Sequence, residues 1–176
     1  MTPFHGGFGL LNFSGVKKTA FFAFQFLNRL GKLELKNSDA RSWVCRDENG
    51  GAQILLWDLT HPTGGKIADN VYVRQPHPAA DKGAVEIKLA GMPPGKYELQ
   101  LRRVGCHHND ACTAYLEMGA PAQLTRAQEN SLRDAGRGGP ESSSPVEINS
   151  TGVFAGTVPL RENEAVLLNL VPIRAR

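Results

Sequence analysis

The stretch AVEIKLAGMPPGKYELQLRRV, residues 84–104, contains two runs in which apolar and polar residues alternate. In residues 84–89, Val, Ile and Leu alternate with Glu and Lys. In residues 96–104, Tyr, Leu and Leu alternate with Glu, Gln and Arg. Successive side chains of a strand point to opposite faces, so this period of two gives each run one apolar face. With the turn sequence GMPPGK between them, the runs predict half-buried strands of antiparallel sheet.

Six further segments have strand composition and a period of about two. They are residues 33–36, 42–46, 53–59, 146–149, 154–160 and 165–171. Turn residues separate them, and residues 60–83 form a long, proline-punctuated loop sequence. Roughly eight strands at this spacing predict a mainly β protein, an antiparallel β-sandwich.

The N-terminal segment has a different pattern. GFGLLNF, residues 7–13, reads as the end of a short apolar strand, followed by a turn at Ser14 and Gly15. A helix is predicted over residues 16–30 and ends at Gly31. Its apolar face consists of Val16, Ala20, Ala23, Phe24, Leu27 and Leu30, widened by Phe22 and Phe26. This arc covers about half the circumference, more than a surface helix needs, so the helix should have neighbours on more than one side.

A second, shorter helix is predicted near residues 125–135. Thr125 and Gln128 have the spacing of a capping box, and Gly136 is placed to end the helix. The following GRGGPESSSP, residues 136–145, reads as a flexible connector.

Composition narrows the class of protein. Hydrophobic residues make up 41% and charged residues 21% of the 176 residues, as in folded globular domains. The formal net charge of +3 is too dilute for a nucleic-acid-binding face, and no apolar run is long enough to cross a bilayer. Three cysteines form no paired framework, which favours a reducing cytoplasm.

The segment CHHNDAC contains residues of zinc-ligand type: Cys106, His107, His108 and Cys112. The two cysteines are not spaced as a structural zinc site requires, and no second ligand pair lies nearby. A polar loop with two incidental thiols is therefore preferred, and a metal-binding β-domain is kept as an alternative. We expect no metal and no cofactor.

The segment HGGFG, residues 5–9, lacks the spacing of a nucleotide-binding loop and reads as a tight passage from strand to loop. Beside a pocket, His5 and the rings of Phe4 and Phe8 could contact a sugar. Trp43 and Trp57 lie in apolar strands, so core packing is favoured over a sugar-stacking platform. No nucleophile elbow or paired carboxylates are evident, so no catalytic residue is assigned.

Three segments resemble glycoside hydrolase family 39, the β-xylosidase family. PFHGGFGLLNFSGVKKTAFFAFQFLNRLG resembles the last strand, loop and helix of the family's (β/α)8 barrel. NDACTAYLEMGAPAQLTRAQENSL and RENEAVLLNL resemble two segments of the accessory domain that follows the barrel. Thr19 stands where proline is usual, and Cys112 stands where an aromatic residue is usual.

The resemblance implies that residues 1–31 are a remnant of the barrel's C-terminal end and that residues 32–176 are the accessory β-sandwich. The family is similar to other retaining glycosidases in using two glutamates, which lie on earlier barrel strands outside this chain. Phe4, His5 and Gly6 correspond to the loop at the catalytic face and are expected, with Phe8, to line a sugar subsite.

The resulting hypothesis is the C-terminal portion of a retaining β-xylosidase-like enzyme, inactive alone. Its expected partners are a xylo-oligosaccharide in the full-length enzyme, the missing barrel and, through self-association of the helix at residues 16–30, a second copy. A free-standing carbohydrate-binding or interaction module is the alternative.

Overall fold

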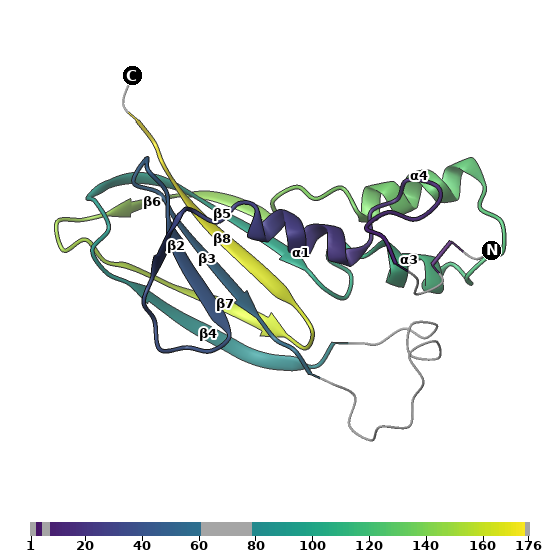
Figure 1. Ribbon diagram of the computed structural model, residues 1–176, viewed down its shortest axis with the longest axis horizontal. Helices are drawn as coiled ribbons and strands as arrows, with labels where there is room; N and C mark the ends of the chain where they lie inside the picture. The colour runs from purple at the N-terminus through teal and green to yellow at the C-terminus, as the bar shows by residue number, and fades with distance from the viewer. Residues whose placement is uncertain (1–2, 5–7, 61–78, 175–176) are drawn as a thin grey trace.

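The computed structural model describes residues 3–4, 8–60 and 79–174, and it is mainly β (Figure 1). Its described helices are α1 (Thr19–Leu27), α3 (Ala111–Glu117) and α4 (Arg126–Ala135). Its described strands are β1 (Leu33–Leu35), β2 (Ser42–Arg46), β3 (Ala52–Trp57), β4 (Asp81–Leu89), β5 (Gly95–Val104), β6 (Ser142–Ile148), β7 (Phe154–Arg161) and β8 (Ala165–Pro172). Each of the eight predicted strand segments is confirmed.

The strands form a six-stranded sheet in the order β1-β2-β3-β8-β5-β6 and a two-stranded sheet, β4-β7. All described strand pairs are antiparallel. The two strands at residues 84–104 therefore do not pair with each other: β4 lies in the small sheet and β5 in the large one. The GMPPGK turn carries the chain from one layer of the sandwich to the other.

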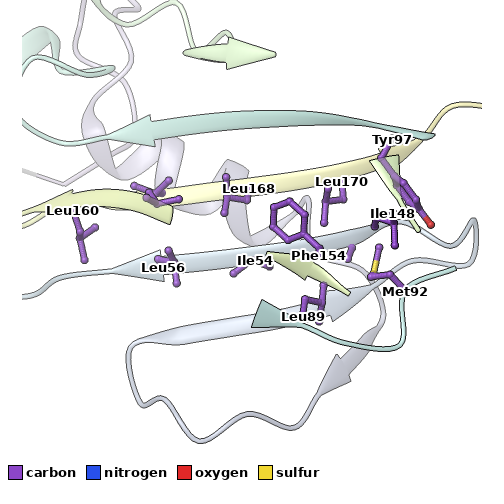
Figure 2. Packing of buried hydrophobic residues seen from close by; sticks show 13 residues of the cluster. Ile54, Leu56, Leu89, Met92, Tyr97, Ile148, Phe154, Leu160, Leu168 and Leu170 are labelled. Carbon is purple, nitrogen blue, oxygen red and sulfur yellow. The ribbon is translucent and has the colours of Figure 1, made fainter. Parts of the chain in front are cut away.

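The main core lies between the two sheets (Figure 2). Phe154 and Leu160 of β7 face Ile54 of β3 and Leu168 of β8, and all four side chains are buried. Tyr97 closes one end of the core and donates its hydroxyl to the Pro93 carbonyl at 2.8 Å. Other buried members are Ala52, Leu56, Leu89, Met92, Ile148, Val158, Val166 and Leu170.

The opposite face of the large sheet is covered by α1. Phe22 and Phe26 are almost wholly buried against Leu55 of β3, Val104 of β5 and Leu167 of β8. The central strands β3 and β8 are thus apolar on both faces, which explains the nearly continuous runs QILLW and AVLLNL.

The chain returns from α1 to the sheet through a close contact at Gly31. Its N–H donates to the Gln53 side-chain oxygen at 2.9 Å. A β-carbon at Gly31 would overlap the Arg46 carbonyl, so glycine is required here for space. Gly31 therefore lies after the helix as predicted, and it also lets the chain approach β2.

The orientation of α1 corrects the sequence prediction. The helix is shorter than residues 16–30, and the side chains that meet the sheet are Phe22 and Phe26 rather than Phe24 and Leu27. Phe24 is 60% exposed and Leu27 is 41% exposed. An apolar arc this wide is compatible with either face turned inward, so periodicity alone could not choose. The sheet covers one side of the arc and leaves Phe24 and Leu27 exposed, so the second neighbour expected for the helix stays a prediction.

Three local predictions were wrong. Residues 8–13 form bends and a turn instead of a strand, with Leu11 making an isolated bridge to Lys17; no neighbouring strand is present in the described chain to pair with them. The connector at residues 136–145 already contains the start of β6, which pairs with β5 from Ser142. The polar loop after Cys106 leads into α3, whose N-cap Asp110 accepts the N–H groups of Cys112 and Thr113, each at 3.1 Å.

Helices α3 and α4 form a small helical lobe at one end of α1 (Figure 1). Its core contains Leu132 of α4 and Tyr115 of α3, together with Phe4 and Val16 from the N-terminal segment. The predicted capping box is confirmed, with Thr125 and Gln128 each bonded to the other's backbone N–H. The N-terminal segment thus packs on the lobe through Phe4 and on the sheet through α1.

The two edges of the large sheet differ from its centre. Strand β1 has three residues, and β6 carries Pro145 between three serines and Val146. Neither edge has a buried apolar residue before Ile148 at the end of β6.

We predict that Phe22→Ala lowers the free energy of unfolding by about 3–5 kcal/mol, because it leaves a cavity between α1 and the sheet. Phe24→Ala is the matched control on the same helix and should cost less than about 1 kcal/mol, since its ring is mostly in solvent. Urea denaturation of the 176-residue chain measures both. Equal losses for the two variants would show that α1 does not bury the face described here.

Candidate functional site

The predicted sugar-contacting residues do not form one described cluster. Phe4 is 8% exposed, and its ring packs on Tyr115 with 5.2 Å between the ring centroids. Phe8 is fully exposed, and His5 and Gly6 lie outside the described residues. Phe4 is thus an anchor for the helical lobe, and the assignment of all four residues to a sugar subsite stays a prediction.

A cavity of about 750 Å³ opens beside the N-terminal half of α1. Its apolar wall includes Ala20 and Ala23 of α1, and its polar wall combines the end of β3, the turn between β7 and β8, and the segment from Gly105 to Thr113. Four carboxylates line it: Asp58, Asp110, Glu162 and Glu164. What these groups can do depends on whether their oxygens are free.

Asp58 is held by hydrogen bonds at the end of β3. Its oxygens accept from Arg41 at 3.0 Å, the Thr60 hydroxyl at 2.8 Å and the Asn163 N–H at 3.1 Å. Burial alone would raise the pKa of this carboxyl, but these donors together with Lys82 outweigh it and hold the pKa below its usual value. Asp58 is therefore a fixed anion that joins β3 to the β7–β8 turn.

Glu164 is the most deeply buried carboxylate among the described residues. One oxygen accepts from Arg103 Nη1 and from the Arg161 backbone N–H at 3.0 Å, and the other accepts from Arg161 Nε at 3.1 Å. Arg103 is also buried, and its Nε donates to Glu141 at 2.9 Å. A buried pair with its hydrogen-bonding atoms occupied supports the structure, but it is not free to attack a substrate.

Asp110 likewise uses its oxygens locally. Besides capping α3, it accepts the Thr113 hydroxyl at 2.5 Å. Asp58, Asp110 and Glu164 are thus occupied by internal contacts, and Glu162 is half-buried and accepts the Ala80 N–H at 3.4 Å. The three buried carboxylates among the described lining residues are committed to the fold.

The cysteines were the other candidates for chemistry. Cys45, Cys106 and Cys112 are all free thiols. Burial and, less strongly, Asp110 raise the pKa of Cys112 to about 11, and burial with Glu34 raises that of Cys45. No group of three or more His, Cys, Asp or Glu side chains in the described part of the chain is arranged to hold a metal ion.

Trp43 differs from its prediction as a core residue. It is 44% exposed and stacks edge-on against Trp57, with 5.6 Å between the ring centroids. Both rings lie on the face of the sheet that α1 covers, at the border of the helix. The alternation in β2 correctly places Trp43 and Val44 on opposite faces of the sheet, but it cannot show that α1 ends before it covers the indole.

Among the described helices, none is long and apolar enough to span a bilayer.

A two-layer β-sandwich with an N-terminal helix and a small helical lobe is a defined architecture among solved proteins. The GH39 enzyme of Xanthomonas axonopodis pv. citri superposes with a TM-score of 0.92 at 36% identity, over 98% of this chain and 34% of that one. A monomeric β-xylosidase of Caulobacter crescentus CB15 gives 0.91 at 33% identity, again over 98% and 34%. A β-xylosidase of Caldicellulosiruptor saccharolyticus is 31% identical over 133 residues, which are 74% of this chain and 25% of the relative.

The model of glycosyl hydrolases family 39 matches residues 1–154. The chain belongs to this family. It spans about a quarter to a third of the length of the relatives named above, and it corresponds to their C-terminal portion.

We predict that Asp58→Asn lowers the free energy of unfolding at pH 7 by about 1–3 kcal/mol, because an amide cannot accept all three donors. Arg41 is mostly exposed, so most of the loss should come from Thr60 and Asn163. The pKa of Asp58 is lowered in the folded state, so its contribution is full above the unfolded value of 3.8 and disappears as the pH falls through the folded value.

Urea titrations at several pH values test this prediction. Asp134→Asn is the control, since both Asp134 and its partner Arg137 are exposed. The difference between the Asp58→Asn variant and the parent should shrink in acid. A constant difference across the pH range would contradict the assigned role.

A second prediction concerns the thiols. At pH 8, Cys45 and Cys112 should react slowly with a thiol reagent because burial and their raised pKa keep them protonated, whereas Cys106 should react first. After unfolding, all three should react. The variant Cys106→Ser should lose the fast phase.

Purified protein should also hold no stoichiometric zinc. Bound zinc whose removal lowers thermal stability would contradict the interpretation of CHHNDAC as a segment that binds no metal.

Proposed function

We propose that this chain is the C-terminal portion of a retaining β-xylosidase-like glycoside hydrolase of family 39. In this proposal, residues 1–31 complete a (β/α)8 barrel and residues 32–176 form the accessory domain. The full-length protein hydrolyses O-glycosidic bonds in xylo-oligosaccharides. The observation that carries the proposal is the match over residues 1–154, combined with structural neighbours that are about three times longer.

The proposal places both catalytic glutamates outside this chain. Retaining hydrolysis requires two carboxyl groups about 5 Å apart, one a nucleophile and one a proton donor. The occupied contacts of Asp58, Asp110 and Glu164 support this placement, because the best-buried carboxylates here are committed to the fold. Phe4, His5, Gly6 and Phe8 then contribute to a sugar subsite only when the barrel is present.

A free-standing carbohydrate-binding module is the second candidate. The exposed indole of Trp43 favours it, since sugars stack on aromatic faces. Its neighbour Trp57 and the surrounding side chains supply almost no hydrogen-bonding groups, however, and sugar sites need several. Binding of xylo-oligosaccharide to the isolated chain, abolished by Trp43→Ala, would favour this candidate.

We predict that the purified 176-residue chain does not release nitrophenol from an aryl β-xyloside above the buffer rate. A chimera in which this chain replaces the matched C-terminal third of the Xanthomonas enzyme should restore the barrel and release it. In that chimera, His5→Ala should weaken substrate handling without loss of folding. Turnover by the isolated chain that disappears on changing one of its own carboxylates would refute the proposal.

A further inference from the structure

The turn between β2 and β3 contains the one Asn-Gly dipeptide of the chain, Asn49-Gly50. In such a pair the backbone nitrogen of the glycine can attack the side-chain amide of the asparagine, because glycine has no β-carbon to hinder the approach. Asn49 is exposed, and Gly50 has a φ of +84°. The Gly50 N–H donates to the Asp47 carbonyl at 3.4 Å, which is long for a hydrogen bond. The attacking nitrogen is therefore only weakly held.

A cationic donor lies at the amide that this nitrogen would attack. Arg174 Nη2 donates to Asn49 Oδ1 at 2.8 Å. Negative charge builds up on this oxygen when a nucleophile adds to the carbonyl carbon, so a guanidinium at hydrogen-bond distance stabilises the transition state. The contact is exposed to solvent, which makes its contribution smaller than that of a buried donor.

Two other exposed asparagines lack this combination. Asn149 is followed by a serine, and its Oδ1 accepts from the Thr151 N–H at 3.0 Å and from the Thr151 hydroxyl at 2.5 Å. Asn37 is also followed by a serine, and its Oδ1 accepts the Asp39 N–H at 2.8 Å. Asn49 differs from both in the glycine that follows it and in the charged donor on its side-chain oxygen.

We propose that Asn49 is a site of spontaneous deamidation, with Gly50 as the nucleophile and Arg174 as the group that promotes its attack. The Gly50 nitrogen loses its proton to hydroxide and bonds to Asn49 Cγ. The bond from Cγ to Nδ2 breaks, and ammonia leaves with a proton from water. A water molecule then opens the succinimide at either carbonyl and gives aspartate or isoaspartate. The site is independent of the proposed function.

The turn that carries Asn49 also supports the chain where it leaves α1. Asp47 closes the turn by accepting the N–H groups of Asn49 at 2.8 Å and Gly51 at 3.0 Å. Its other oxygen accepts from the Gln53 amide at 2.9 Å, and Gln53 Oε1 accepts the Gly31 N–H at 2.9 Å. Isoaspartate adds a methylene to the backbone of this turn and displaces these donors, whereas aspartate keeps the backbone length. The isoaspartate form should therefore be the less stable product.

Prolonged incubation of the 176-residue chain at pH 8, followed by tryptic mass spectrometry, tests the site. The tryptic peptides 47–66 and 138–161 contain one asparagine each, Asn49 and Asn149, so the second peptide is an internal control. Asn49 should convert at least about tenfold faster than Asn149, because only Asn49 precedes a glycine. In heavy-oxygen water, the product should carry the label. Equal rates at the two positions overturn the proposal.

The variant Arg174→Gln tests the role of the guanidinium. It should slow the conversion of Asn49 by about threefold, since a neutral amide stabilises the developing charge less well. Arg137→Gln is the control, because Arg137 is exposed and pairs with Asp134. In urea, the parent and Arg174→Gln should convert at the same rate. A folded Arg174→Gln variant that converts as fast as the parent or faster, or a difference that persists in urea, overturns the role of Arg174.

The aged protein tests the consequence for the fold. An isoaspartate-specific methyltransferase identifies the isoaspartate fraction after chromatographic separation. This fraction should unfold at a lower urea concentration than the variant Asn49→Asp, which has the same charge and a backbone of normal length. Equal unfolding midpoints overturn the proposed effect of the rearranged turn.

Discussion

The structure depends on the burial of strands β3 and β8 on both faces. Their side chains alternate between two apolar environments, so Leu167 faces α1 while Leu168 faces the small sheet. A six-stranded sheet with such a centre needs a cover on each side. The β4-β7 pair covers one face and α1 covers the other. Both are held there by packing on the apolar side chains of the large sheet.

This constraint makes the N-terminal segment part of the packing of the sandwich. Phe22 and Phe26 belong to the packing of the β-sandwich, although the resemblance assigns residues 1–31 to a barrel. A boundary drawn at residue 31 therefore separates sequence segments, but it does not separate the packing. Cutting there would uncover Leu55, Val104 and Leu167. The helix is therefore not a remnant beside an independent sandwich, because it closes one face of the large sheet.

Much of the β architecture could be predicted because the period of two is strong in β4 and β5 and because turn residues separate the strands. The pairing could not, since alternation in Val85 and Tyr97 shows a buried face without showing which strand lies alongside. The sequence does not predict helix α3 because its seven residues span only two turns and its cap, Asp110, lies inside the polar segment CHHNDAC. Of the candidate site, the sequence could not show that Phe4 packs on Tyr115 while Phe8 is exposed, because both phenylalanines lie in one short glycine-rich segment without periodicity.

The edge strands of the large sheet limit how copies of this chain can pair through that sheet. With three residues in β1 and a proline within β6, neither border offers a long ladder of free backbone groups on which another strand could grow. A partner of the large sheet should therefore contact side chains on its faces rather than add a strand at either border.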